Sequence, residues 1–524
     1  MLTIFSSALL YALSFPKSPL FFLGFFFLIP MLYALDRKGK GKTTGGFFLF
    51  FTFSFLSYLV ILYWIPRVMV RYGGMGQTLS ILGLIMLAAA LSLFNGIAGI
   101  FIKKTIEAPK KAVKNNVEKI LPVFLIPLIW VGKDLVIEKI FGGFPWCLAG
   151  YSQYTNLYFI QMAEIGGIHL VTFVLIYFNI LFYRFIKQGD KQTAIVILVS
   201  FFSLYTVGYF LYRVNESKIR PLETHRAGII QPNTTNDPIT WVERNKILQR
   251  LFKESEELAQ KGAEFIVWPE HTVSIYPLQN KNHYQRFMDF VGSHVPLLAG
   301  FTDLKGANEI YNSVILFGKG KIEKYDKVHL TPFGEYVLFR ELLFFVKRIT
   351  DEIGDFTPGA AVDNLVIDDH PVSTPICYEI IFPGLVREFI SKGGELIITI
   401  SNDSWFGDTS APYQHLSMAV FRAIENRRYI LRSTTNGISA VILPSGQIGY
   451  RSSYYAADRF IGEFKYIKRK TFFNCCGYLF PYFCLFLLAV YIVARKIKFK
   501  KKASGGPADV SRAKLLKKFD QNFY

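Results

Sequence analysis

Cysteine is scarce in this chain of 524 residues, and its five cysteines form no spaced framework. They stand at positions 147, 377, 475, 476 and 484, without any pair of CxxC units. The sequence therefore suggests neither a disulfide scaffold nor a zinc site built on paired cysteines. At least one thiol is left free to take part in chemistry.

Charged residues are also few, at 19% of the chain, whereas apolar residues make up 51% and aromatic residues 16%. This composition is too apolar for a single soluble fold and predicts several membrane spans. Apolar runs of membrane length recur at residues 3–15, 18–35, 46–65, 76–102, 120–138, 157–183, 193–212 and 473–494. We therefore expect eight spans.

Acidic residues are outnumbered by basic ones, 39 against 59, which gives a formal net charge of +20. No nucleic-acid module and no interleaving of basic with aromatic residues accompanies this charge, so no nucleic-acid partner is expected. Instead, thirteen basic residues follow spans two, four and six, and only four follow spans one, three and five. Because cytoplasmic loops collect Lys and Arg, the long segment before the last span is predicted to lie on the outer face.

This pattern predicts a transmembrane domain at 1–213, an extracytoplasmic domain at 214–472, a last span at 473–494 and a basic cytoplasmic tail at 495–524. In the extracytoplasmic domain, short strand-like runs alternate with amphipathic helical runs. Strands are predicted at 227–231, 264–268, 296–301, 311–316, 364–367, 371–376, 396–401, 439–443 and 460–463, and helices at 240–261, 281–293, 382–392 and 412–431. About 250 residues suffice for one α/β domain with a substantial core.

Cys377 is the candidate nucleophile, because a strand-like apolar run stops there and a carboxylate follows two residues later. A thiol reacts as the thiolate, so it needs a nearby base, a cation or a helix N-terminus. The run Phe382 to Ile390 is a candidate for that helix. The competing interpretation is a small buried hydrophobe at a strand end.

Two further strand ends carry ionisable residues. Glu270 follows a proline that ends its strand, and it would act as a general base if partly buried; the alternative is an exposed acid in a turn. His271 is a rival base, but the sequence offers no partner to orient it. Lys327 would favour the thiolate and hold a developing oxyanion; otherwise it pairs with Asp326 or a neighbour at the surface.

Glu270, Lys327 and Cys377, in this order and each at a strand end of one α/β domain, resemble the nitrilase superfamily. The eight spans and several motifs make the chain resemble one membrane-embedded branch of it, the apolipoprotein N-acyltransferases. The motifs are Phe144-Pro145-Trp146, Trp268-Pro269-Glu270, Pro332-Phe333-Gly334-Glu335-Tyr336, Cys377-Tyr378-Glu379 and Ser401-Asn402-Asp403-Ser404-Trp405-Phe406-Gly407. The chain departs from the family in its long basic tail and in Cys475-Cys476.

The resemblance implies a multi-span α-helical membrane domain plus an extracytoplasmic αββα sandwich, in a bacterial inner membrane with the sandwich on the periplasmic side. It also implies a ping-pong acyl transfer from a phospholipid, typically phosphatidylethanolamine, to the N-terminal amine of the diacylglyceryl-cysteine of an apolipoprotein. Cys377 would carry the acyl chain as a thioester, with Glu270 as base and Lys327 at the oxyanion.

The family match further implies supporting roles for Glu335, Tyr378 and Glu379. It implies that Trp146, Trp241 and Phe333 line the substrate groove. Neither a cofactor nor a metal is implied, and we expect a monomer.

Two other functions remain open at this point. A membrane-tethered amidase of the nitrilase type would use the same three residues with water as the acceptor. A transporter or receptor would use the outer domain only to bind a ligand, but the spans contain few charges and no paired broken helices.

Overall fold

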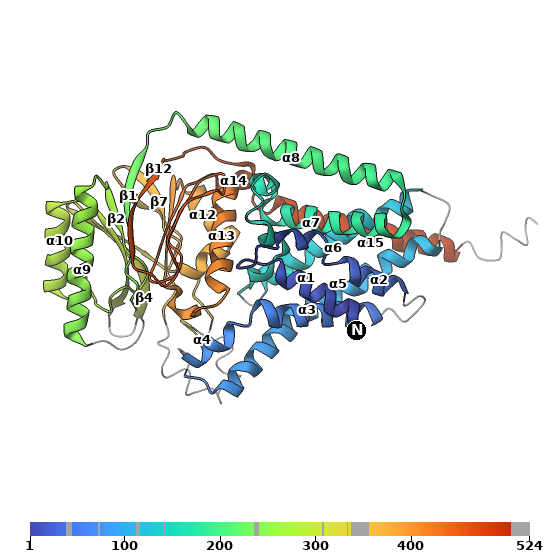
Figure 1. Ribbon diagram of the computed structural model, residues 1–524, viewed down its shortest axis with the longest axis horizontal. Helices are drawn as coiled ribbons and strands as arrows, with labels where there is room; N and C mark the ends of the chain where they lie inside the picture. The colour runs from blue at the N-terminus through green and yellow to red at the C-terminus, as the bar shows by residue number, and fades with distance from the viewer. Residues whose placement is uncertain are drawn as a thin grey trace, which may run out of the picture.

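The computed structural model describes residues 1–37, 44–71, 74–111, 116–140, 142–234, 240–306, 309–332, 334–336 and 356–504. Long helices make up one part of the molecule and a layered α/β domain makes up the other (Figure 1). The helices of the first part are α1 Leu2–Leu13, α2 Ile29–Arg37, α3 Thr44–Ile61, α4 Ile65–Arg71, α5 Gln77–Lys111, α6 Asn116–Lys139, α7 Ala163–Gln188, α8 Lys191–Ile219, α14 Phe472–Cys476 and α15 Leu479–Ser504.

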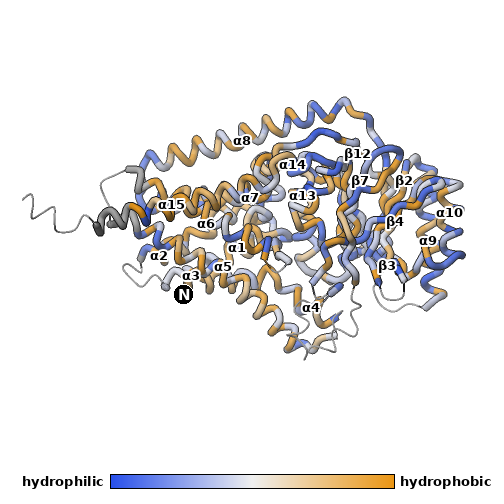
Figure 2. The backbone as a smooth tube through the Cα atoms, turned by 180° about the vertical axis from the view of Figure 1, so that it is seen from behind, coloured by the Kyte–Doolittle hydropathy of each residue, from blue (hydrophilic) through white to orange (hydrophobic). Residues whose placement is uncertain are grey.

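Within the described residues, six apolar helices are long enough to cross a membrane, so the protein is a multi-pass membrane protein. They cover Thr44–Ile61, Gln77–Glu107, Ile120–Lys139, Phe159–Gln188, Lys191–Ile219 and Leu479–Ile497. The first two of the eight predicted spans correspond to shorter apolar helices, Leu2–Leu13 and Phe21–Asp36. Figure 2 shows hydrophobic residues concentrated along the long helices, while α9 and α10 of the other domain carry many hydrophilic ones.

The α/β domain contains two six-stranded sheets, ordered β12-β1-β2-β3-β4-β5 and β11-β10-β9-β8-β7-β6. The strands are β1 His225–Gln231, β2 Phe265–Val267, β3 Leu297–Lys305, β4 Glu309–Gly318, β5 Lys321–Asp326, β6 Leu365–Ile367, β7 His370–Ser373, β8 Leu396–Ser401, β9 Ile430–Thr434, β10 Ala440–Ile442, β11 Ile448–Arg451 and β12 Asp458–Phe464. The helices are α9 Trp241–Gln260, α10 Lys281–Ser293, α12 Pro383–Ser391 and α13 Ala411–Asn426.

Side-chain alternation along the strands produces the layers. In β8, Leu396, Ile398 and Ile400 lie in the core between the two sheets, while Ile397 belongs to the core on the other face. Helices α9 and α10 cover the outer face of the first sheet, and α12 and α13 cover that of the second (Figure 1). The predicted combination of helical membrane domain and αββα sandwich is confirmed.

Helix α13 joins the two parts of the molecule. Its Arg422 and Glu425 are fully buried and paired, with 2.7 Å between Nε and Oε2. The Glu425 carboxylate also accepts a hydrogen bond of 2.8 Å from the backbone N–H of Ile168 in α7. Apolar side chains of α13, the second sheet and the membrane helices form one continuous core, so the α/β domain is seated directly on the helices.

The predicted helix at 412–431 is too long. Helix α13 ends at Asn426, because Arg427 adopts a left-handed conformation with φ 48°, and β9 begins at Ile430. The prediction also lacked β5, β9 and β11. β5 has the sequence KIEKYD, whose charged residues conceal the strand pattern, and it forms because β4 supplies an antiparallel partner.

Candidate active site

Glu270 lies three residues beyond the end of β2 and is 3% exposed. Its carboxylate accepts hydrogen bonds from the side-chain amide of Asn312 at 2.7 Å and from the backbone N–H of Asn402 at 2.8 Å. The alternative of an exposed acid in a turn is therefore wrong. Two donors hold the carboxylate in one orientation inside the domain.

Lys327 directly follows β5 and is 1% exposed, so it is not a surface residue paired with Asp326. Its Nζ lies 2.9 Å from the Glu335 carboxylate and 3.8 Å from that of Glu270. Burial by itself lowers the pKa of Lys327, but the two carboxylates outweigh it and hold that pKa above its usual value. The amine is therefore positively charged at neutral pH.

Cys377 lies where β7 has ended and a short 3₁₀ helix, η6 Cys377–Ile381, begins. The predicted helix starts later, at Pro383, so the backbone that follows the thiol directly is η6. Cys377 has φ 47°, and its Sγ lies 3.3 Å from the hydroxyl of Ser401 at the end of β8. Burial, followed by the charge of Glu270, raises the pKa of the thiol, and the charge of Lys327 opposes this.

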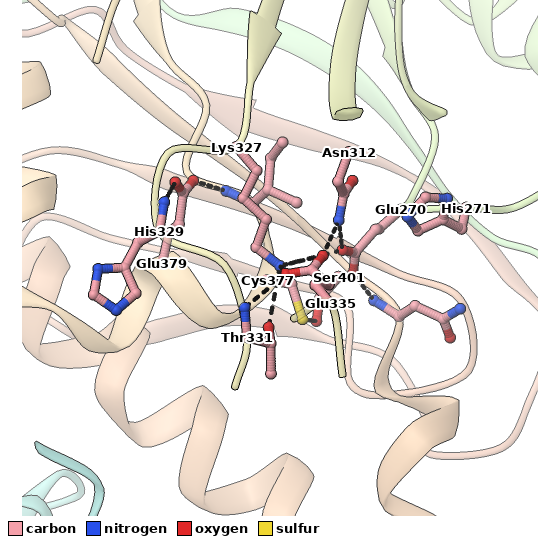
Figure 3. A network of polar contacts seen from close by, with 12 residues as sticks. Glu270, His271, Asn312, Lys327, His329, Thr331, Glu335, Cys377, Glu379 and Ser401 are labelled. Carbon is pink, nitrogen blue, oxygen red and sulfur yellow. Dashed lines mark hydrogen bonds and ion pairs between the residues drawn. The ribbon is translucent and has the colours of Figure 1, made fainter. Parts of the chain in front are cut away.

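Figure 3 shows the Cys377 sulfur beside the Lys327 amine, with Glu335 and Glu270 next to them. The structure thus brings together the three residues that lie far apart in the sequence. A thiol, a carboxylate and a buried ammonium group in this arrangement have the chemistry needed for a general base, a nucleophile and a cation that stabilises an oxyanion.

Glu379 connects the Lys327 strand to the Cys377 turn. One carboxylate oxygen accepts hydrogen bonds from the Tyr325 hydroxyl at 2.8 Å and from the backbone N–H groups of Val328 and His329 at 2.8 and 3.0 Å. The other oxygen accepts from the N–H of Ile376 at 2.8 Å. Burial raises the pKa of Glu379 to about 7. These four hydrogen bonds hold the segments on either side of the site at a fixed separation.

The two halves of the chain match different family models. Residues 7–181 match the apolipoprotein N-acyltransferase N-terminal domain, and residues 226–457 match carbon-nitrogen hydrolase. The apolipoprotein N-acyltransferase of Geobacter metallireducens is 31% identical over 519 residues, covering 95% of this chain and 95% of that protein. This chain belongs to the apolipoprotein N-acyltransferase family.

Other relatives carry the same name. The apolipoprotein N-acyltransferase of Aquifex aeolicus is 27% identical over 84% of this chain and 93% of that protein. Among solved structures, Nit3 of Saccharomyces cerevisiae, a member of branch 10 of the nitrilase superfamily, is 19% identical with a TM-score of 0.38. It covers 46% of this chain and 90% of its own.

In this member of the apolipoprotein N-acyltransferase family, the other predicted residues lie at different distances from the thiol. Tyr378 is next to Cys377, and its hydroxyl donates to the carbonyl of Gly143 in the helical domain at 3.4 Å. Trp146 is buried and its ring stacks on that of His415, whose Nε2 lies 3.1 Å from the Cys377 carbonyl oxygen.

Trp241 is 71% exposed at the start of α9, in the helix layer on the far face of the first sheet. It is absent from the hydrogen bonds and ring contacts around Cys377 in the described part of the chain. Phe333 lies outside the described residues. His271 lies beyond Glu270 as seen from the sulfur, and its Nδ1 is 3.2 Å from the Thr302 hydroxyl (Figure 3).

The sequence-based prediction missed several polar residues at the site. Asn312 donates to both Glu270 and Glu335, the latter at 2.6 Å. Asn312 is the only amide side chain within β4, where most of the other buried residues are apolar. This polar break in an apolar strand was a signal available in the sequence. Ser401 opens the run 401–407 on which the sequence resemblance partly rests, but its contact with Cys377 becomes visible only when β7 and β8 are paired.

Behind the thiol lies a buried network. Asp403 accepts from Ser401 at 2.6 Å and from the Arg432 guanidinium at 2.8 Å, and it lies 3.3 Å from His415 Nδ1. Burial raises the pKa of Asp403, but the Arg432 and His415 contacts outweigh it and hold that pKa well below its usual range. The ionised network supports the segment beneath the nucleophile.

Proposed function

We propose that this chain transfers an acyl chain from a membrane phospholipid, with phosphatidylethanolamine as the expected donor, to the N-terminal amine of a diacylglyceryl-cysteine on an apolipoprotein. The observation that carries the proposal is the convergence of Glu270 and Lys327 on Cys377 within a domain seated on membrane helices. The names of the relatives support the same reaction class.

In the first half-reaction, the Glu270 carboxylate takes the thiol proton while Cys377 Sγ attacks the ester carbonyl carbon of the phospholipid. The raised thiol pKa makes this base necessary. Negative charge develops on the carbonyl oxygen, and the ammonium group of Lys327 stabilises it. The carbon–oxygen bond then breaks, the leaving oxygen takes the proton from Glu270, and a lysophospholipid departs from the thioester.

In the second half-reaction, the α-amine of the lipoprotein attacks the thioester carbonyl. Glu270 takes a proton from the amine, Lys327 again holds the oxyanion, and the carbon–sulfur bond breaks. An amide forms, and the sulfur of Cys377 recovers its proton. The thioester keeps the acyl group activated, so the scheme needs no nucleotide and no cofactor.

The site adjoins the helical domain, and we infer that lipid substrates reach it from that side. Tyr378 contacts Gly143, and Trp146 stacks on His415, which in turn contacts the Cys377 carbonyl. Gly143 and Trp146 both belong to the loop after α6. We propose that Trp146 and Phe333 lie on the path of the substrates and that Glu335, Tyr378 and Glu379 have supporting roles. The exposed Trp241 lies in the helix layer on the far face of the first sheet, and no contact among the described residues supports the same role for it. The alternation of basic loops supports a periplasmic α/β domain on a bacterial inner membrane.

The nitrilase fold by itself is compatible with either acceptor, so it does not favour the amidase alternative. The similarity to acyltransferases includes the helical domain as well as the α/β domain, and this favours acyl transfer. Hydrolysis of a small carboxamide would need an anchor but no extended set of apolar helices.

Mass spectrometry of the full-length protein isolated from membranes tests the proposal. We expect a hydroxylamine-sensitive acyl adduct on the peptide that contains Cys377, and its loss in Cys377→Ser. Cys147→Ser is the matched control, because Cys147 is buried within the helical domain and the adduct should remain. Carboxamide hydrolysis without an adduct on Cys377 would instead favour the amidase.

A further inference from the structure

A pocket lies where α8 meets the α/β domain. The end of α8 and the residue Leu222 form one wall, the segment from Tyr466 to Arg469 forms another, and His370, Glu395 and Arg427 complete the lining. Its cavity volume is about 320 Å³. In Figure 1 the chain between β12 and α14 runs beside the end of α8.

This pocket is separate from the site around Cys377. Glu395 immediately precedes β8, whereas Ser401, at the other end of the same strand, is the residue that contacts the Cys377 sulfur. A strand advances about 3.3 Å per residue, so β8 places the pocket roughly 20 Å from the thiol.

Positive charge dominates the lining. Four cationic residues line the pocket, against one carboxylate, that of Glu395. They are Lys218, Arg427, Lys468 and Arg469. Lys468 lies 3.5 Å from Glu395, and Arg469 donates to Asn215 at 2.8 Å. An anionic ligand is therefore favoured.

Arg427 gives the clearest indication that the pocket binds a ligand. It is 2% exposed, its Nε donates to Glu164 at 2.5 Å, and its Nη1 donates to Gln161 and to the carbonyl of Pro444 at 2.8 and 2.9 Å. Its Nη2 is buried and has no hydrogen-bond partner among the described residues. Since buried donors are normally matched, an acceptor oxygen from a ligand would complete this guanidinium.

The surroundings favour a lipid over a small ion. α8 is an apolar helix long enough to cross a membrane, and the pocket lies at its last turn. Ile219, Leu222 and Ile467 add apolar surface to the cationic lining. A phospholipid combines a phosphate with apolar chains at the same depth, at the end of a membrane helix.

We propose that this pocket binds the phosphate group of a resident membrane phospholipid, distinct from the acyl donor. The lipid would connect the end of α8 to the segment before α14, and so hold the α/β domain against the membrane helix α8. Its phosphate oxygens would accept from Arg427 Nη2 and from the ammonium groups of Lys218 and Lys468.

Native mass spectrometry of the full-length protein in detergent with added phosphatidylglycerol tests this proposal. The Cys377→Ser background prevents consumption of lipid at the thiol. The double variant K218Q/K468Q should retain the lipid at least fivefold less well, since each lysine near a lipid phosphate contributes about fivefold in affinity. E395Q should retain it better, because the variant removes the opposing charge. R213Q is the matched control, as Arg213 lies on α8 but outside the pocket lining, and retention should not change.

Opposite responses of K218Q/K468Q and E395Q cannot arise from a general loss of folding, which would lower retention in both. Equal retention in K218Q/K468Q and R213Q would overturn the proposal, as would a loss in E395Q. Inorganic phosphate at millimolar concentration should leave the lipid bound. Complete displacement by phosphate would make the pocket a site for the free ion and refute the lipid assignment.

Discussion

Glu379→Gln tests whether the carboxylate of Glu379 holds the Lys327 segment and the Cys377 turn together. The substitution preserves the size of the side chain and replaces one acceptor oxygen with an NH₂ group. If the amide oxygen keeps the three hydrogen bonds of Tyr325, Val328 and His329, the new NH₂ faces the N–H of Ile376. Two donors then confront each other in a buried position.

The expected loss follows from these contacts. Three hydrogen bonds change from an ionic to a neutral acceptor, which costs about 1 kcal/mol each. Burial opposes these hydrogen bonds and raises the pKa of Glu379 to about 7, so replacing the carboxylate by a neutral amide also removes a desolvation penalty, which offsets the weaker hydrogen bonds. The unmatched Ile376 donor remains, and it lowers stability by about 1–3 kcal/mol.

Thermal unfolding in detergent measures this loss. A domain of this size loses about 3 °C in Tm per kcal/mol, so Glu379→Gln should lower Tm by roughly 3–9 °C and slow thioester formation at Cys377. Glu388→Gln is the matched control: Glu388 is on the nearby helix α12, its carboxylate is 51% exposed and 3.6 Å from Lys392, and its loss should cost under about 0.5 kcal/mol. If Glu379→Gln matches this control in Tm and in thioester formation, the connecting role of Glu379 is wrong.

Two further predictions concern the thiol and its base. The charge of Glu270 disfavours the thiolate and that of Lys327 favours it. The pH midpoint for alkylation of Cys377 should therefore fall in Glu270→Gln and rise in Lys327→Met, although both variants lose acyl transfer. Shifts of the same sign would contradict the electrostatic assignment. In Gly300→Ala the new Cβ would meet the Cα of Glu270 at 2.7 Å, so thioester formation should slow about 10–100-fold. Gly292→Ala is the control, because Gly292 has open space around it and the rate should not change. Equal rates in the two variants would show that the position of Glu270 tolerates this displacement.

The strength of each local pattern decided which elements the sequence could predict. Strands such as β8 are continuous apolar runs, and α9 is a long amphipathic run, so both were predicted near their observed bounds. β9 begins shortly after the end of the buried helix α13, and the sequence pattern of the helix continues into the strand. Only the left-handed backbone at Arg427 separates the two, and composition does not reveal that conformation.

The amino-acid sequence by itself determined the presence of apolar helices of membrane length, the alternation of buried strands with amphipathic helices, and the three ionisable strand ends at Glu270, Lys327 and Cys377. These features depend on residues close together in the chain. The tertiary structure alone decided the partners: Asn312 between two carboxylates, Ser401 on the sulfur, and Arg427 beside a cavity. Each of these contacts joins segments that are brought together by sheet pairing and by packing against the helices, and burial then sets their charges, which no local pattern encodes.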